Sequence, residues 1–216
     1  MFLNLLGLAA AVFFAYAFFT LFLRSIHSAS WLAKLLGGLV AGAAALLFAG
    51  AFVIGLLGMW RLEAPRSRAV SDIKVEPTAE LIARGRQVAQ SCIPCHSFDG
   101  GPDLNGGARN LAPVISGIST GVVYAPNLTP GGDIKRWSDG EIIRAVREGV
   151  DGRGIPLLHP AAQYRSMSDE DAAGLVAYLR SQPELRHDQP RRSLNLPGLL
   201  MLGAGWLQTG EQPPLP

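Results

Sequence analysis

The chain contains only two cysteines, Cys92 and Cys95, and His96 directly follows the second. Two cysteines three positions apart with a histidine next to the second form the attachment pattern of a c-type haem. Both thiols can bond to one porphyrin, and the adjacent imidazole can then bind the iron. We therefore expect one covalently attached haem c, held by Cys92 and Cys95, with His96 as an axial ligand.

Two other uses of a cysteine pair fit this sequence poorly. A structural zinc site needs four ligands, and no further Cys or His follows Cys92 and Cys95 at metal-binding spacing. A thioredoxin-like pair lies within a βαβ pattern, whereas the segments around Cys92 have the pattern of helices and loops. Two incidental buried thiols remain the alternative to haem attachment.

A second axial ligand must come from a small set of histidines and methionines. Most of this set lies in or between two apolar N-terminal segments, or beyond the last expected helix: His27, His187, Met1, Met59 and Met201. The remaining candidates are His159 and Met167. A site with neither bound would leave the iron open to an external ligand.

Two long apolar segments at the N-terminus are expected to be transmembrane helices. Residues 1–23 carry no charge and would make about 35 Å of helix, enough to cross a hydrocarbon core of ~30 Å. Residues 35–60 form a second uncharged run of similar length, rich in Gly and Ala. Met1 to Asn4 lack the basic residues that begin a cleavable signal peptide, so we expect the first segment to be retained.

The short connection between these segments predicts their orientation in the membrane. It contains Arg24, His27 and Lys34, and short basic loops tend to stay cytoplasmic. The N-terminus and everything after Trp60 would then lie on the periplasmic or outer face of a bacterial cytoplasmic membrane. Arg61 and nearby arginines weaken the charge argument, but haem attachment to a Cys-x-x-Cys-His motif takes place on that face.

The rest of the chain divides into a linker, a haem domain and a C-terminal extension. Residues 61–77 are polar with two prolines, typical of a linker, and residues 78–185 carry the haem motif. Residues 186–216 form the extension. Its apolar part, residues 194–207, is too short to span a membrane. This part could pack on the haem domain, lie in the membrane interface with Trp206 as an anchor, or bind a partner.

The charge distribution argues against a nucleic-acid partner. Removing Arg24 and Lys34 from the 19 basic residues leaves 17 against 17 acidic residues beyond position 60, so the polar part is formally neutral. A neutral surface also gives weak electrostatic steering of soluble partners.

Helical start and stop signals predict an all-α haem domain with three main helices. Thr78 is a candidate N-cap for a helix that runs toward Cys92, and Pro94 should loosen or end it. Ser138 followed by Glu141, and Ser168 followed by Asp171, each start a further helix. Glycines and prolines between positions 98 and 130 predict a long loop, with a short hairpin around residues 117–124.

The order of these motifs resembles a class I cytochrome c. The chain has a helix into Cys-x-x-Cys-His, a Gly-rich loop, and then three further motifs: Asn127-Leu128-Thr129-Pro130, Trp137-Ser138-Asp139 and Met167-Ser168-Asp169-Glu170-Asp171. More narrowly, it is similar to the haem domains of bacterial membrane-associated cytochrome c subunits that serve alcohol and sugar dehydrogenases. The similarity covers about residues 79–183.

The resemblance implies roles for several residues. Gly85 would lie where the first and last helices cross, near Tyr178, and the haem pocket would be lined by Asn127, Thr129 and Trp137. In this family the axial methionine begins a Met-Pro pair eight residues before the position of Met167. This chain has His159 there, followed by Pro160. We thus expect iron held by His96 and His159, with Met167 as the alternative sixth ligand.

The expected function is that of a membrane-anchored monohaem cytochrome c that relays single electrons. Two protein ligands on iron leave no place for a small-molecule substrate, so we expect an electron-transfer protein, not an enzyme by itself. Its partners would be the membrane and redox proteins, as a subunit of a membrane redox complex of the respiratory or photosynthetic kind. Two alternatives are a haem-based sensor with a displaceable sixth ligand and a structural assembly subunit with a secondary haem.

Overall fold

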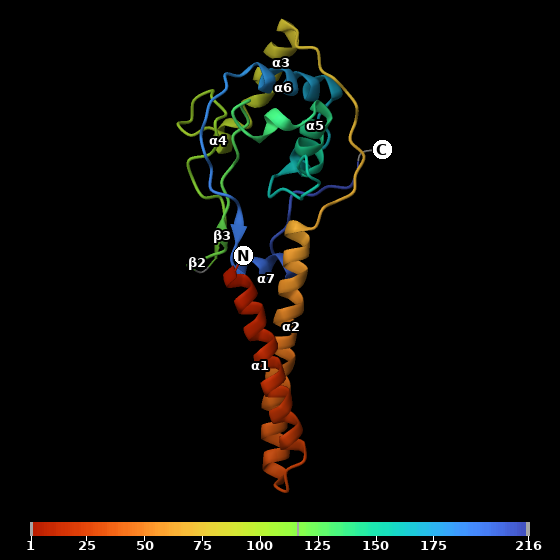
Figure 1. Ribbon diagram of the computed structural model, residues 1–216, viewed down its shortest axis with the longest axis vertical. Coiled ribbons are helices and arrows are strands. Elements are labelled where there is room, and N and C mark those ends of the chain that lie inside the picture. The colour runs from red at the N-terminus through yellow and green to blue at the C-terminus, as the bar shows by residue number, and fades with distance from the viewer. Residues whose placement is uncertain (1, 116, 215–216) are drawn as a thin grey trace. The chain divides into compact units, whose positions relative to one another are not determined.

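The computed structural model describes residues 2–115 and 117–214 and is mostly helical (Figure 1). The chain divides into two compact units. Unit 1 comprises residues 1–61, 115–120 and 194–207, and unit 2 comprises residues 62–114, 121–193 and 208–216. Each unit is therefore assembled from segments that are far apart in the sequence.

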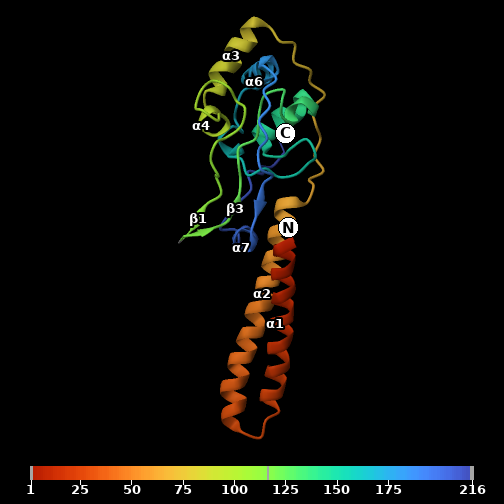
Figure 2. The same cartoon turned by 60° about the vertical axis from the view of Figure 1, so that its left-hand side comes forward.

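Unit 1 contains the two apolar helices that the sequence predicts. Helix α1 spans Phe2–Ile26 and helix α2 spans Gly38–Glu63, preceded by a π-helical turn, η1, at Ala33–Gly37. The two helices run side by side in opposite directions (Figures 1 and 2), and Phe14 and Phe18 of α1 contact the ring of Phe48 in α2. With mean hydropathies of 2.2 and 2.4, both helical segments are long and apolar enough to cross a membrane.

The C-terminal apolar segment also belongs to unit 1. Helix α7 (Leu196–Ala204) begins at its N-cap Asn195 and crosses α2 closely. A Cβ on Gly203 would lie 1.9 Å from the carbonyl oxygen of Ile54, and one on Gly58 would lie 2.0 Å from that of Leu199. Such backbone contact requires glycine on both helices. The sequence left three alternatives for residues 194–207, and none of them was this contact with α2.

Polar contacts fix both ends of α7 within unit 1. The Asn4 side chain donates a hydrogen bond of 2.8 Å to the carbonyl of Leu194, just before the helix. At the other end, Arg61 Nη1 donates to the carbonyls of Leu202 and Gly203. These carbonyls belong to the last turn, where a helix has no internal donors left. These contacts therefore anchor both ends of α7.

Within the described residues, four two-residue strands form two minimal ladders. Strand β1 (Val114–Ile115) pairs with β2 (Ile118–Ser119), and β3 (Gly121–Val122) pairs with β4 (Ser193–Leu194). The hairpin expected around residues 117–124 is thus shifted toward the N-terminus. Gly117 has a φ of +79°, a left-handed conformation that suits a turn, so it lies in the hairpin turn instead of starting a strand.

Unit 2 contains the expected helices α3 (Ala79–Ala89), α5 (Asp139–Glu148) and α6 (Asp169–Ser181). It also contains the short helix α4 (Ile93–His96) and the 3₁₀ turns η2 (Asp133–Arg136) and η3 (Ala161–Gln163), which the sequence did not predict. The hydroxyls of Thr78, Ser138 and Ser168 cap the three main helices as predicted. At Ser138 the Glu141 side chain completes a capping box.

Helices α3 and α6 cross at two glycines and enclose the core. A Cβ on Gly85 would lie 1.8 Å from the carbonyl oxygen of Gly174 and 2.8 Å from Cβ of Tyr178. The close approach predicted for Gly85 near Tyr178 is confirmed. The buried cluster at this crossing includes Leu175 and Leu179 of α6, together with Leu104 from the long loop.

The predicted linker has no helix or strand from residue 64 to residue 78 but is bound along the haem domain. The amide of Arg66 donates a hydrogen bond of 2.7 Å to the carbonyl of Gly154, and the amide of Val75 donates to the carboxylate of Asp139. The carbonyl of Ser71 would lie 2.0 Å from a Cβ on Gly140. This segment therefore lies on unit 2 as an ordered strap, which its polar composition did not indicate.

Candidate haem site

The Cys-x-x-Cys-His motif lies on the short helix α4. Helix α3 ends at Ala89, and Cys92 is the N-cap of α4, with Pro94 in the first helical turn. Proline is tolerated there because the first amides of a helix have no internal acceptor. Cys92 and Cys95 carry free thiols, three positions apart at the two ends of this turn. The arrangement suits two attachments to one porphyrin next to the His96 imidazole.

His96 is oriented by a backbone hydrogen bond. The side chain is buried, and its Nδ1 lies 2.8 Å from the carbonyl oxygen of Pro126. Because a carbonyl only accepts, Nδ1 carries the proton, and Nε2 keeps its lone pair for a metal. Burial lowers the pKa of His96, which favours the neutral imidazole that metal binding requires. The structure thus gives His96 the properties of a metal ligand.

The structure brings His159 to His96 across 63 residues of sequence. Their ring centres are 6.5 Å apart, and the ring planes make an angle of 55°. His159 also stacks on Tyr164, with ring centres 5.5 Å apart. Burial, and to a smaller degree the charge of His96, lowers the pKa of His159 to about 4. Both imidazoles are therefore neutral at physiological pH.

Met167 lies in the hydrophobic packing between α5 and α6. It packs against the buried core cluster of unit 2, beside Ile142, Val146 and Leu175. The backbone carbonyl of Met167 accepts a hydrogen bond from Arg147. Its side chain therefore has the surroundings of a core residue.

Asn127 and Thr129 use their polar atoms within the loop that they form. Asn127 Oδ1 accepts from both the amide and the hydroxyl of Thr129, each at 2.8 Å. The Asn127 amide donates to the carbonyl of Leu185, beyond α6, and the same carbonyl lies 3.2 Å from the Thr129 hydroxyl, whose single proton the two acceptors share. These bonds tie the loop to the end of the domain. The predicted role of the two residues in lining a haem pocket is not tested by these contacts.

Trp137 packs against the core cluster at the end of η2, beside Gly152. A Cβ on Gly152 would lie 2.9 Å from the Trp137 ring, so the ring covers the backbone there. This placement agrees with a structural position near the start of α5. Its role in a haem pocket likewise stays a prediction.

The donor set of this region fits a haem c. Cys92 and Cys95 are free thiols beside a neutral, oriented imidazole, which is what covalent attachment and proximal ligation need. Within residues 2–115 and 117–214 there is no cluster of three or more His, Cys, Asp or Glu side chains that could hold a metal ion alone. A haem iron takes four ligands from its porphyrin and so does not require such a cluster.

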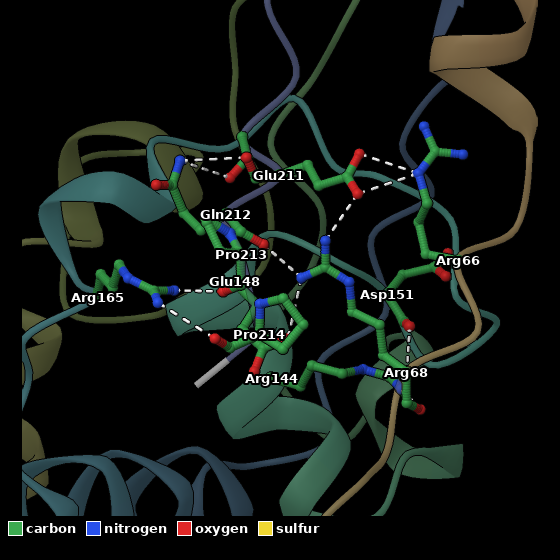
Figure 3. Close-up of polar contacts among 11 residues, drawn as sticks. Arg66, Arg68, Arg144, Glu148, Asp151, Arg165, Glu211, Gln212, Pro213 and Pro214 are labelled. Carbon is green, nitrogen blue, oxygen red and sulfur yellow. Dashed lines mark hydrogen bonds and ion pairs between the residues drawn. The ribbon is translucent and has the colours of Figure 1, made fainter. Parts of the chain in front are cut away.

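Sequence reasoning missed the residues that surround the His159 loop. Arg66 and Arg68, from the strap before α3, reach the carboxylate of Glu211 in the C-terminal tail (Figure 3). Gly210 in the same tail contacts the backbone of His159. The sequence offered only one sign of this contact, the opposite charges of two segments more than 140 positions apart. No local sequence pattern links those segments.

Comparison with known proteins finds similarity to cytochromes c in the central part of the chain. Residues 82–183 match the cytochrome c family. The chain is also 37% identical over 150 residues to a nicotinate dehydrogenase subunit from Pseudomonas putida; the match covers 64% of this chain but only 12% of that protein. Cytochromes c carry covalently bound haem c and transfer electrons. Residues 82–183, which include Cys92, Cys95 and His96, therefore resemble a class I c-type cytochrome, and the chain resembles part of a dehydrogenase subunit.

Proposed function

We propose that this chain is a membrane-anchored monohaem cytochrome c that relays single electrons, with one haem bound through Cys92 and Cys95. In this proposal His96 and His159 are the two axial ligands. The observation that carries it is the approach of the two imidazole rings, 6.5 Å apart, inside the cytochrome c domain. The haem supplies one-electron chemistry at its iron, and the residues of the chain determine its ligation and access.

The ring separation supports ligation by both histidines. An imidazole nitrogen lies about 2 Å from a bound transition metal and roughly 1 Å from the centre of its own ring, so a metal between two imidazoles places the ring centres about 6 Å apart. The observed 6.5 Å agrees with this spacing. The low pKa of His159, about 4, keeps its nitrogen available as a ligand throughout the physiological pH range.

Ligation by two histidines has consequences for the chemistry. His96 and His159 would both hold a bound haem, which would leave no room for a substrate at the iron and would restrict the haem to electron transfer. Because methionine ligation raises the potential of a haem, a His96 and His159 pair gives a lower potential than a His/Met pair. Met167, packed in the apolar core between α5 and α6, remains the alternative ligand.

Helices α1 and α2 support a membrane anchor. They are 25 residues and, with the π turn, 31 residues long, and only Arg24 and Lys34 are charged before Arg61. In this proposal the haem domain lies on the periplasmic or outer face, because short basic connections such as the one between the two helices tend to stay cytoplasmic. The similarity to a dehydrogenase subunit supports a place in a membrane redox complex, where neighbouring subunits donate and accept the electron.

Two substitutions in the full-length, haem-loaded protein test the ligation. Replacing His159 by alanine is expected to convert a low-spin, six-coordinate spectrum into a high-spin one and to raise the reduction potential. Replacing Met167 by leucine, of similar volume, is expected to leave both unchanged. A far-red charge-transfer band of sulfur ligation in the oxidised parent, abolished by M167L, would overturn the proposal. Purification in mild detergent as a lone 23.0 kDa species would overturn the place in a complex.

A further inference from the structure

We propose that residues 208–214, here called the tail strap, position the His159 loop and thereby keep the sixth coordination site closed. Arg66 and Arg68 would be positioning residues that act through Glu211 of the strap. This inference rests on the proposed ligation by His159. It concerns residues that lie outside the matched range 82–183.

The imidazole ring of His159 makes few contacts, so its position depends on how the backbone of His159 is held. Its Nδ1 is buried and has no hydrogen-bond partner among the residues that the structure describes. Metal-binding histidines almost always donate this second ring nitrogen to an acceptor, as His96 does to the carbonyl of Pro126. The stacking on Tyr164 restrains the ring plane but not its distance from His96. The position of the ring thus depends on what holds the loop.

The tail strap is in direct backbone contact with this loop. The amide of Gly210 donates a hydrogen bond of 2.7 Å to the carbonyl of Leu157. A Cβ on Gly210 would lie 1.7 Å from the carbonyl oxygen of His159. No side chain fits there, so the strap lies against the backbone of the ligand residue itself.

The opposite side of the tail strap contacts the C-terminal end of α5. Gly149, the left-handed C-cap of α5, lies so close that its Cβ would be 2.3 Å from the carbonyl oxygen of Gly210. The amide of Gln212 donates to the carbonyl of Glu148 at 2.9 Å. The amide of Leu157 in this loop also donates directly to the carbonyl of Gly149 at 2.7 Å. The strap therefore packs against both the end of α5 and the His159 loop, and it adds to the direct bond that already joins them.

Charged side chains fasten the tail strap in place (Figure 3). The Glu211 carboxylate accepts from Arg66 Nε at 3.0 Å and from Arg68 Nη2 at 2.7 Å. Arg68 also bonds to the Glu148 carboxylate at 3.1 Å and to the carbonyl of Gln212. The Arg68 and Glu148 side chains are each only 10% exposed, so solvent weakly screens these pairs. Beyond them, Arg165 donates to the carbonyls of Pro213 and Pro214.

Carbon monoxide binding to the reduced, haem-loaded full chain in detergent tests this inference. Carbon monoxide binds ferrous haem only when the sixth position opens, so its rate reports the open fraction. Glu211→Gln removes the charge that Arg66 and Arg68 hold, and we expect carbon monoxide to bind about tenfold faster, a change equivalent to ~1.4 kcal/mol. The matched control is Glu184→Gln, which breaks the exposed pair with Lys135 in the same unit and should leave the rate at the parent value.

The outcomes separate the tail strap from the proposed ligation. His159→Ala should bind carbon monoxide fast whatever the strap does; if it binds as slowly as the parent, the ligation by His159 is wrong. If His159→Ala opens the site but E211Q matches E184Q, only the strap inference is wrong. If E211Q does not incorporate haem, Arg165→Ala, which removes the contacts to the end of the tail strap, takes its place in the test. Carbon monoxide binding to that variant at the rate of the parent would overturn the inference.

Discussion

Replacing Gly85 by alanine is expected to force α3 and α6 apart. The new Cβ would lie 1.8 Å from the carbonyl oxygen of Gly174 and 2.3 Å from its carbonyl carbon. Ordinary van der Waals contact begins at 3.4 Å, so the backbones would have to separate by about 1.6 Å. Both partners are helix backbone, which cannot rotate away as a side chain can.

The expected cost of this separation exceeds the gain in helix propensity. Overpacking in a core costs about 1–3 kcal/mol, and Ala in place of Gly in a helix returns about 1 kcal/mol. Since the crossing encloses the main core cluster of unit 2, we expect the upper part of this range and a net loss of about 2 kcal/mol. For a domain of this size the melting temperature falls by about 8 °C.

Gly174→Ala is the matched control on the facing helix. Its Cβ would lie 3.1 Å from the Gly85 amide nitrogen and 3.2 Å from the carbonyl oxygen of Leu81, which requires shifts of only a few tenths of an ångström. Thermal unfolding of the haem-loaded proteins, followed by circular dichroism, compares the two. We expect G174A within about 2 °C of the parent, because propensity offsets the strain. A G85A protein as stable as G174A would refute the crossing geometry.

Two further predictions concern α7 and α5. Gly203→Val would place a Cβ 1.9 Å from the carbonyl oxygen of Ile54, so we expect α7 to separate from α2 and the amides of α7 to exchange hydrogen faster. Ala204→Val, at an exposed position, is the control and should leave this exchange unchanged. Equal protection in both variants would contradict the contact. Ser138→Ala removes the hydroxyl that accepts from the Glu141 amide at 3.2 Å, and we expect a loss of about 1 kcal/mol in the free energy of unfolding, measured by denaturant titration. An unchanged midpoint would show that the cap adds nothing.

The helices of the haem domain could be predicted because their signals are local. Thr78, Ser138 and Ser168 each accept from an amide three residues further along, so one short stretch of sequence contains both partners. The pairing of His96 with His159 came from family spacing, since nothing near either residue specifies the other. In the folded chain the two rings lie 6.5 Å apart, although only the segment of His96 packs on the core cluster, through Cys92 and Ile93.

The tail strap and the packing of α7 could not be predicted because their contacts join distant residues of ordinary type. Arg66 and Glu211 are 145 positions apart and lie in segments whose Pro and charge content is typical of linkers. Gly58 and Gly203 are small residues in apolar stretches, where glycine is frequent whether or not a second helix approaches. Only the folded backbone shows that each pair meets.

The division of the chain has a consequence for proteolysis. The chain passes between the two units five times, after residues 61, 114, 120, 193 and 207. A cytochrome tethered by a single linker is set free by one cut in that linker. Here a cut between residues 69 and 74 leaves α7 on the same fragment as the haem motif, and α7 stays packed on α2 through Gly58 and Gly203. The nicked cytochrome would therefore remain with its apolar helices instead of becoming a diffusible electron carrier.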